Sequence, residues 1–78
     1  MMDLTVDMQS RCANVILRDP PAPAMTTLSD SVFAFCDGDE LTALEILDTT
    51  QFGDPFDEAA AIRAVAWARE QLAAHAAS

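Results

Sequence analysis

The chain has 78 residues, a formal net charge of −9 and a pI of about 4.1. Its four basic residues are all arginines, and so few cations exclude binding to a phosphate backbone or to an anionic membrane surface. Apolar residues make up 51% of the chain, which excludes a disordered acidic tail and predicts a single folded domain over residues 1–78.

Two short strands are predicted in the first part of the chain, because apolar and polar residues alternate there. The first strand is expected over residues 3–8, and the second over residues 12–17, where Asn14 faces away from the apolar side chains. The prolines between Asp19 and Pro23 then remove backbone donors and favour extended geometry. This segment is interpreted as a loop that leads from one hairpin to the next.

A second hairpin is predicted around the dipeptide Asp37-Gly38. Residues 31–36 form an apolar run that contains two phenylalanines, and Asp-Gly between two apolar runs is typical of a hairpin turn. The return strand is expected over residues 41–47, with Glu45 on the opposite face from the apolar side chains.

A C-terminal helix is predicted over residues 55–74. Asp54 is the expected N-cap, Pro55 suits the first helical position, and the acidic residues Asp57 and Glu58 suit the first turn. The alanine-rich sequence that follows favours the helix strongly.

The predicted helix carries two groups of apolar side chains. At about 100° per residue, Ile62 and Val65 fall on one side, and Phe56 and Trp67 fall roughly opposite them. A helix on a small sheet needs one apolar stripe. We therefore expect the second group, with Phe56, Arg63 and Trp67 as candidate contacts, to join two copies of the chain in a homodimer or to contact an obligate partner. The alternative is that Trp67 covers a sheet edge and that the alanines are filler.

Together these elements predict an α+β fold: a small four-stranded, mostly antiparallel β-meander of two hairpins within residues 3–47, followed by one helix at about 55–74. Cys12 and Cys36 lie in no Cys-x-x-Cys motif, and no secretory signal starts the chain. We expect a cytoplasmic protein with reduced thiols and no membrane contact.

No catalytic, cofactor-binding or metal-ligating residue is predicted. His75 is the only histidine and lies close to the C-terminus, so neither cysteine has an evident base to activate it. Gly38 and Gly53 are the only glycines, which excludes a glycine-rich phosphate-binding loop.

A candidate acidic surface is formed by carboxylates near the second hairpin: Asp37, Asp39, Glu40 and Glu45. The first three are interpreted as a solvated turn, with a weak calcium site as the alternative. Glu45 is expected to face solvent or to pair across strands with Arg11 or Arg18.

The segment Leu41-Thr42-Ala43-Leu44-Glu45-Ile46-Leu47-Asp48-Thr49-Thr50 resembles the last strand of the domain-of-unknown-function 2283 family of small bacterial and archaeal proteins. The resemblance covers about residues 3–50 and implies a small β-meander without established enzyme activity. Some relatives are encoded beside small toxins, which implies an antitoxin-like role. Ala43 stands where the family often has glycine, Asn14 where it often has an aromatic residue, and the helix is longer than in most members.

Three classes of function follow from these observations. The first is a small, acidic, non-catalytic protein-interaction module, antitoxin-like, that neutralises a basic partner by contacts that weaken with salt. The second is a structural homo-oligomer, in which the acidity serves solubility alone. The third is an enzyme, which requires a pocket with a perturbed carboxylate or a thiolate.

Overall fold

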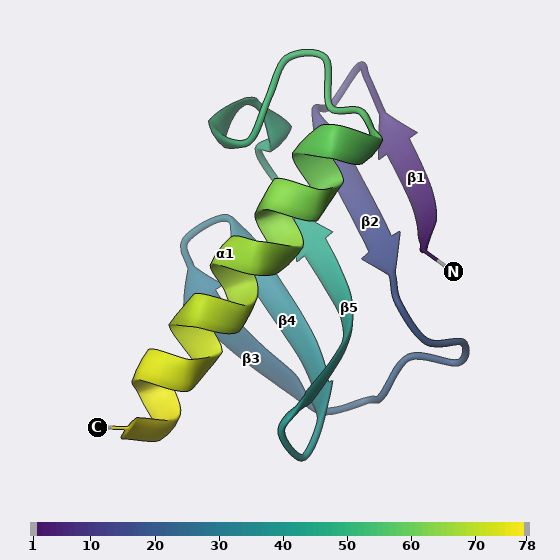
Figure 1. Cartoon of the computed structure of the whole chain (residues 1–78). Helices are drawn as coiled ribbons and strands as arrows, with labels where there is room; N and C mark the ends of the chain where they lie inside the picture. Colours follow the sequence, from purple (N-terminus) through teal and green to yellow (C-terminus); the bar gives the residue numbers. More distant parts are fainter. Residues whose placement is uncertain (1, 78) are drawn as a thin grey trace.

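The computed structural model describes residues 2–77 and shows an α+β fold, in which one helix lies across one face of a five-stranded antiparallel sheet (Figure 1). The strand order is β1-β2-β5-β4-β3, so β5 is the central strand and β1 and β3 form the edges. The elements are β1 (Asp3–Asp7), β2 (Cys12–Ile16), β3 (Met25–Ser29), β4 (Val32–Asp37), β5 (Glu40–Ile46), the short 3-10 helix η1 (Thr49–Gln51) and α1 (Glu58–Ala77).

Both predicted hairpins are confirmed. β1 pairs with β2, and β4 returns as β5 through a turn in which Asp37 pairs with Glu40. Gly38 lies in this turn at a φ of +61°, a conformation that glycine adopts without the steric cost of a Cβ atom. β5 joins the two hairpins into one sheet, because Glu45 lies beside Asn14 of β2 on one side and beside Phe33 of β4 on the other.

The predicted number of strands is wrong, because β3 is a fifth strand that the sequence analysis missed. It pairs antiparallel with β4, with Met25 opposite Phe35 and Thr27 opposite Phe33. An edge strand has one neighbour and buries few of its side chains, so its sequence carries only a weak alternating pattern. The segment Met-Thr-Thr-Leu-Ser also follows a run of prolines directly, which hid its start.

Buried Thr42 of β5 holds the proline-rich loop against the sheet. Its hydroxyl oxygen accepts a hydrogen bond from the Ala22 amide at 2.9 Å and donates to the Phe35 carbonyl at 2.7 Å. Its own carbonyl accepts from the amides of Leu17 and Arg18 at 2.8 and 3.1 Å. These bonds, with a further one from the Cys36 amide to the Ala24 carbonyl at 3.0 Å, fix the loop between β2 and β3, which crosses the sheet at one end (Figure 1).

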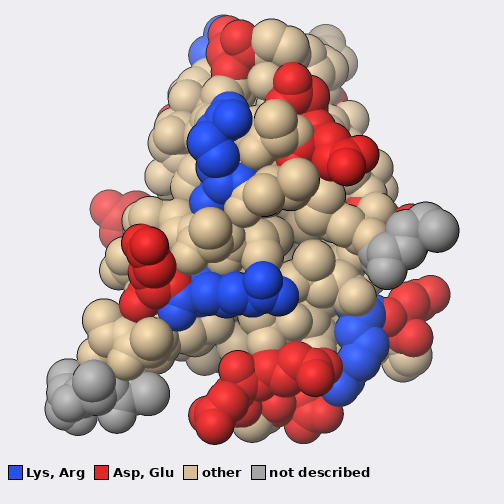
Figure 2. Space-filling model, viewed as in Figure 1, with Lys and Arg blue, Asp and Glu red and all other residues tan. Residues whose placement is uncertain are grey.

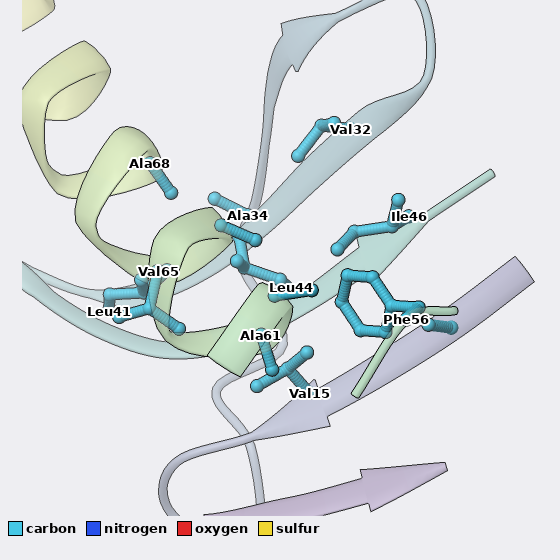
Figure 3. Close-up of a cluster of buried hydrophobic side chains, with 13 residues drawn as sticks. Val15, Val32, Ala34, Leu41, Leu44, Ile46, Phe56, Ala61, Val65 and Ala68 are labelled. Atoms are coloured by element: carbon cyan, nitrogen blue, oxygen red, sulfur yellow. The ribbon is translucent and has the colours of Figure 1, made fainter. Parts of the chain in front are cut away.

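The helix begins three residues later than expected, at Glu58 rather than at Pro55. The residue that caps it is Asp57, whose carboxylate accepts a hydrogen bond from the Ala60 amide at 3.0 Å. Phe56 precedes the helix, and its side chain is buried in the core near Ile46 (Figure 3). The prediction of Asp54 as the N-cap is thus wrong, because the chain first inserts this phenylalanine into the core and only then turns into the helix.

One stripe of small side chains packs α1 on the sheet, and the prediction of two separate apolar faces is wrong. The buried residues of the helix are Ala60, Ala61, Ala64, Val65 and Ala68. They recur at the three- and four-residue spacing of a single helix face. Figure 3 shows members of this stripe beside Val15, Leu44 and Leu41 of the sheet. The alanines are therefore contact residues that bring the helix close to the strands, whereas Ile62 is 56% exposed.

Candidate functional site

The three candidate interface residues lie in different surroundings. Phe56 is only 5% exposed and belongs to the core of its own chain. Trp67 is half-buried at the edge of that core, and its ring meets Phe52 in an edge-to-face arrangement with 5.6 Å between ring centroids. Arg63 is exposed on the helix. Phe56 is thus occupied within the chain, and only Arg63 and Trp67 remain at the surface.

Arg63 and Trp67 both fasten the segment after β5 to the helix. The Arg63 guanidinium donates from Nε and Nη2 to the Phe52 carbonyl, at 3.2 and 2.8 Å. Gly53 follows at the point of closest approach, where an added Cβ would lie 2.8 Å from Arg63 Nη2 and 3.0 Å from Ala60 Cβ. Arg63 and Trp67 thus each make a separate contact with Phe52. These contacts give both residues a structural role within one chain.

Two of the candidate acidic residues form ion pairs with the same arginine. Arg18 Nη2 lies 2.9 Å from Asp37 Oδ2, and Arg18 Nη1 lies 2.7 Å from Glu40 Oε2. The hydrogen bond to Asp37 is the largest cause that raises the pKa of Arg18. Figure 2 shows acidic side chains gathered at the lower end of this view, where the β4–β5 turn lies in Figure 1, with a basic side chain against them. Because all three side chains are largely exposed, this network adds little stability.

Glu45 is separated from the turn and lies in the middle of the sheet. The predicted cross-strand pair with Arg18 is not formed, because that arginine is engaged by Asp37 and Glu40. The Arg11 charge instead helps to lower the pKa of Asp48, after the hydrogen bonds from Thr50. Among residues 2–77, the only ion pairs are those of Arg18, so the half-buried Glu45 carboxylate has no cation beside it.

The face of the sheet turned away from α1, here called the open face, is an apolar surface that was not predicted from the sequence. Ile16, Phe33 and Phe35 are half-buried but lie outside the core cluster that packs against the helix. Their neighbours along each strand, such as Ala34 of β4, belong to that cluster. Since successive side chains of a strand point to opposite faces, these three residues point away from α1.

Strand pairing arranges the open face in two rows. The first row runs through Ile16, Ala43, Phe35 and Met25, and the second through Asn14, Glu45, Phe33 and Thr27. The first row is apolar from Ile16 to Met25, which is 55% exposed, and Asp3 of β1 lies beside Ile16 at the other end of the row. The second places a carboxylate beside an aromatic ring. The sequence of β4 indicated this surface, because its apolar run is uninterrupted. Strands that are covered on both faces have such continuous apolar sequences.

A cleft of about 570 Å³ lies between the last turns of α1 and the β4–β5 hairpin. Cys36 and Leu41 line it from the sheet, and Arg69 and Leu72 from the helix. Burial raises the pKa of the Cys36 thiol, which disfavours the thiolate that nucleophilic catalysis requires. Both cysteines are free, and the described residues contain no group of three side chains placed to hold a metal ion.

No protein-family model, curated protein or solved structure matches the chain. The resemblance to the domain-of-unknown-function 2283 family therefore stays a prediction from the residues of the last strand. Within residues 2–77, no helix is long and apolar enough to cross a membrane.

Proposed function

We propose that the chain is a non-catalytic, cytoplasmic protein-interaction module whose partner is a basic protein. The observation that carries this proposal is the open face, where an apolar row lies beside the Glu45 carboxylate, which has no cation in contact with it. A partly exposed apolar surface of this kind favours contact with another macromolecule. The negative charge of the open face favours a partner with positive charge.

The distribution of charge supports a basic partner. None of the five strands contains an arginine or a lysine, whereas Asp3, Asp7 and Glu45 all lie on strands. A net charge of −9 attracts cationic proteins at long range and repels nucleic acid. The resemblance stated above adds an antitoxin-like role, in which this module would neutralise a small basic toxin.

A pull-down from the native host, analysed by mass spectrometry, tests the proposal. We expect a small basic protein to be retained at low salt and released as the ionic strength rises, because exposed charges are screened. The captured protein must then bind the purified chain directly. If only acidic or neutral proteins are recovered, or if binding is insensitive to salt, the proposed function is wrong.

Self-association of the chain is the alternative function that one observation favours. A second copy would also cover the half-buried phenylalanines of the open face. The homodimer expected through Phe56, Arg63 and Trp67 remains a prediction. Sedimentation at micromolar concentration distinguishes the two functions: a stable monomer excludes a structural homo-oligomer, whereas a dimer that persists at high salt favours it.

A further inference from the structure

The open face joins apolar and acidic side chains at one place. Phe35 and Ile16 flank Ala43, which is only 2% exposed although it lies outside the core cluster. Ala43 is thus shielded by its larger neighbours, which form a continuous apolar row across three strands. Glu45 lies in the adjacent row, two residues further along β5.

A helix is the element that suits such a surface. A sheet face is normally covered by a packed layer, and α1 already provides that layer on the opposite side. A strand of a partner would instead pair with the free backbone groups of an edge, at β1 or β3. A helix can also present apolar and basic side chains together, because residues three and four positions apart share one face.

We propose that the open face binds an amphipathic helix of the basic partner, whose apolar stripe covers Phe35 and Ile16 and whose Lys or Arg pairs with Glu45; this site rests on the proposed function above. The carboxylate gives the site its preference for a cation, and the aromatic ring of Phe33 beside it adds attraction for the same charge. Binding would complete a helix–sheet–helix arrangement.

A second copy of this chain is a poorer occupant of the open face. Alternation along β1 places Asp3 and Asp7 on the same side of the sheet as Glu45, since Leu4 and Val6 pack against the core. Two such faces in contact would bring carboxylates of both copies together without a strand cation to neutralise them. Juxtaposed like charges oppose association.

Titration calorimetry tests this site by measuring how a model helix composed of leucine and lysine binds to the full chain. A helix of leucine and glutamate is the charge-reversed control. Glu45→Gln and Phe33→Ser alter the open face. Their controls on the exposed side of α1 are Glu70→Gln, which makes the same change, and Ile62→Ser, which also replaces a large apolar side chain by a small polar one.

We expect Glu45→Gln and Phe33→Ser each to weaken binding of the lysine helix about tenfold, and the two controls to change it less than about twofold. If Glu45→Gln and Glu70→Gln weaken binding equally, attraction is spread over the whole surface and the site is wrong, although a basic partner remains. If the lysine helix binds no better than the glutamate helix, both the site and the proposed function fail.

Two further outcomes are decisive. If the free chain is a dimer that Phe33→Ser dissociates, the occupant is a second copy and the proposal is overturned. If circular dichroism shows that Phe33→Ser does not fold, the near-isosteric pair Glu45→Gln and Glu70→Gln decides alone, because neither removes packing atoms.

Discussion

Thr42 is the residue on which the loop between β2 and β3 depends most. Its side chain is fully buried, and both its hydroxyl and its carbonyl hold backbone groups of other segments. Buried polar atoms that lose a hydrogen-bond partner keep the full cost of leaving water. A threonine in a strand reads from sequence as an ordinary β-branched residue, so this role becomes visible only in the structure.

Thr42→Val should therefore lower the free energy of unfolding by about 2 kcal/mol, because the Ala22 amide and the Phe35 carbonyl both lose a buried partner. Thr42→Ser keeps the hydroxyl and loses one methyl group, so it should cost about 1 kcal/mol or less. Urea unfolding of the two variants measures the difference. Equal losses would show that packing, and not hydrogen bonding, gives Thr42 its importance.

At the scale of elements, α1 shows how small side chains determine the geometry of packing. The sequence correctly indicated a long alanine-rich C-terminal helix, because propensity and composition are local properties. It did not reveal which side faces the sheet. The prediction assigned the packing faces from the large apolar residues. In the structure the alanines pack against the sheet, and Ile62 is exposed to solvent.

Ala64→Leu should destabilise the chain by about 1–3 kcal/mol, since Ala64 is 0% exposed and the contact has no room for three more carbon atoms. Ala66→Leu makes the same change on the exposed side and should stay within about 0.5 kcal/mol of the parent chain. Thermal unfolding compares them. Similar melting temperatures for the two variants would contradict the helix orientation described above.

The segment after β5 depends on an ionised carboxylate. Asp48 Oδ1 accepts hydrogen bonds from Thr50 Oγ1 at 2.5 Å and from the Thr50 amide at 3.1 Å, and these bonds lower the pKa of Asp48 from its ordinary 3.8. A lowered native pKa adds stability that is fully present above pH 3.8 and is lost as the pH falls through the native value.

Asp48→Asn should thus be less stable than the parent chain at neutral pH, and this difference should shrink as the pH falls below 3.8. Chemical unfolding at a series of pH values provides the measurement. A difference that stays constant over the acid range would show that the charge of Asp48 does not contribute.

The elements that could not be predicted share a physical cause. The two hairpins could be recognised because an Asp-Gly turn and alternating strands are local signals. β3 and the true start of α1 depend on tertiary contacts: β3 on its pairing with β4, and the helix start on the burial of Phe56. The sequence identified Glu45 as a carboxylate in the middle of a strand. The aromatic side chains near it could be placed on the same face only once the pairing of the strands was known.

At the scale of the whole molecule, one layer of helix covers one face of the sheet, and the acidic charge is spread over the remainder. Arg18 neutralises part of it at the β4–β5 turn, and Arg63 is engaged by a backbone carbonyl. The charged residues within the strands are all aspartate or glutamate. A basic partner placed on the open face would therefore bury exposed apolar surface and offset charge at the same time.

Methyl NMR spectra of the unmodified chain can locate the binding of a basic helix on the open face. Ile16 and Met25 report on the open face, whereas Ile62 and Leu72 report on α1. On addition of the leucine–lysine helix, we expect the methyl signals of Ile16 and Met25 to shift and those of Ile62 and Leu72 to stay in place. Shifts confined to Ile62 and Leu72 would contradict the proposed site.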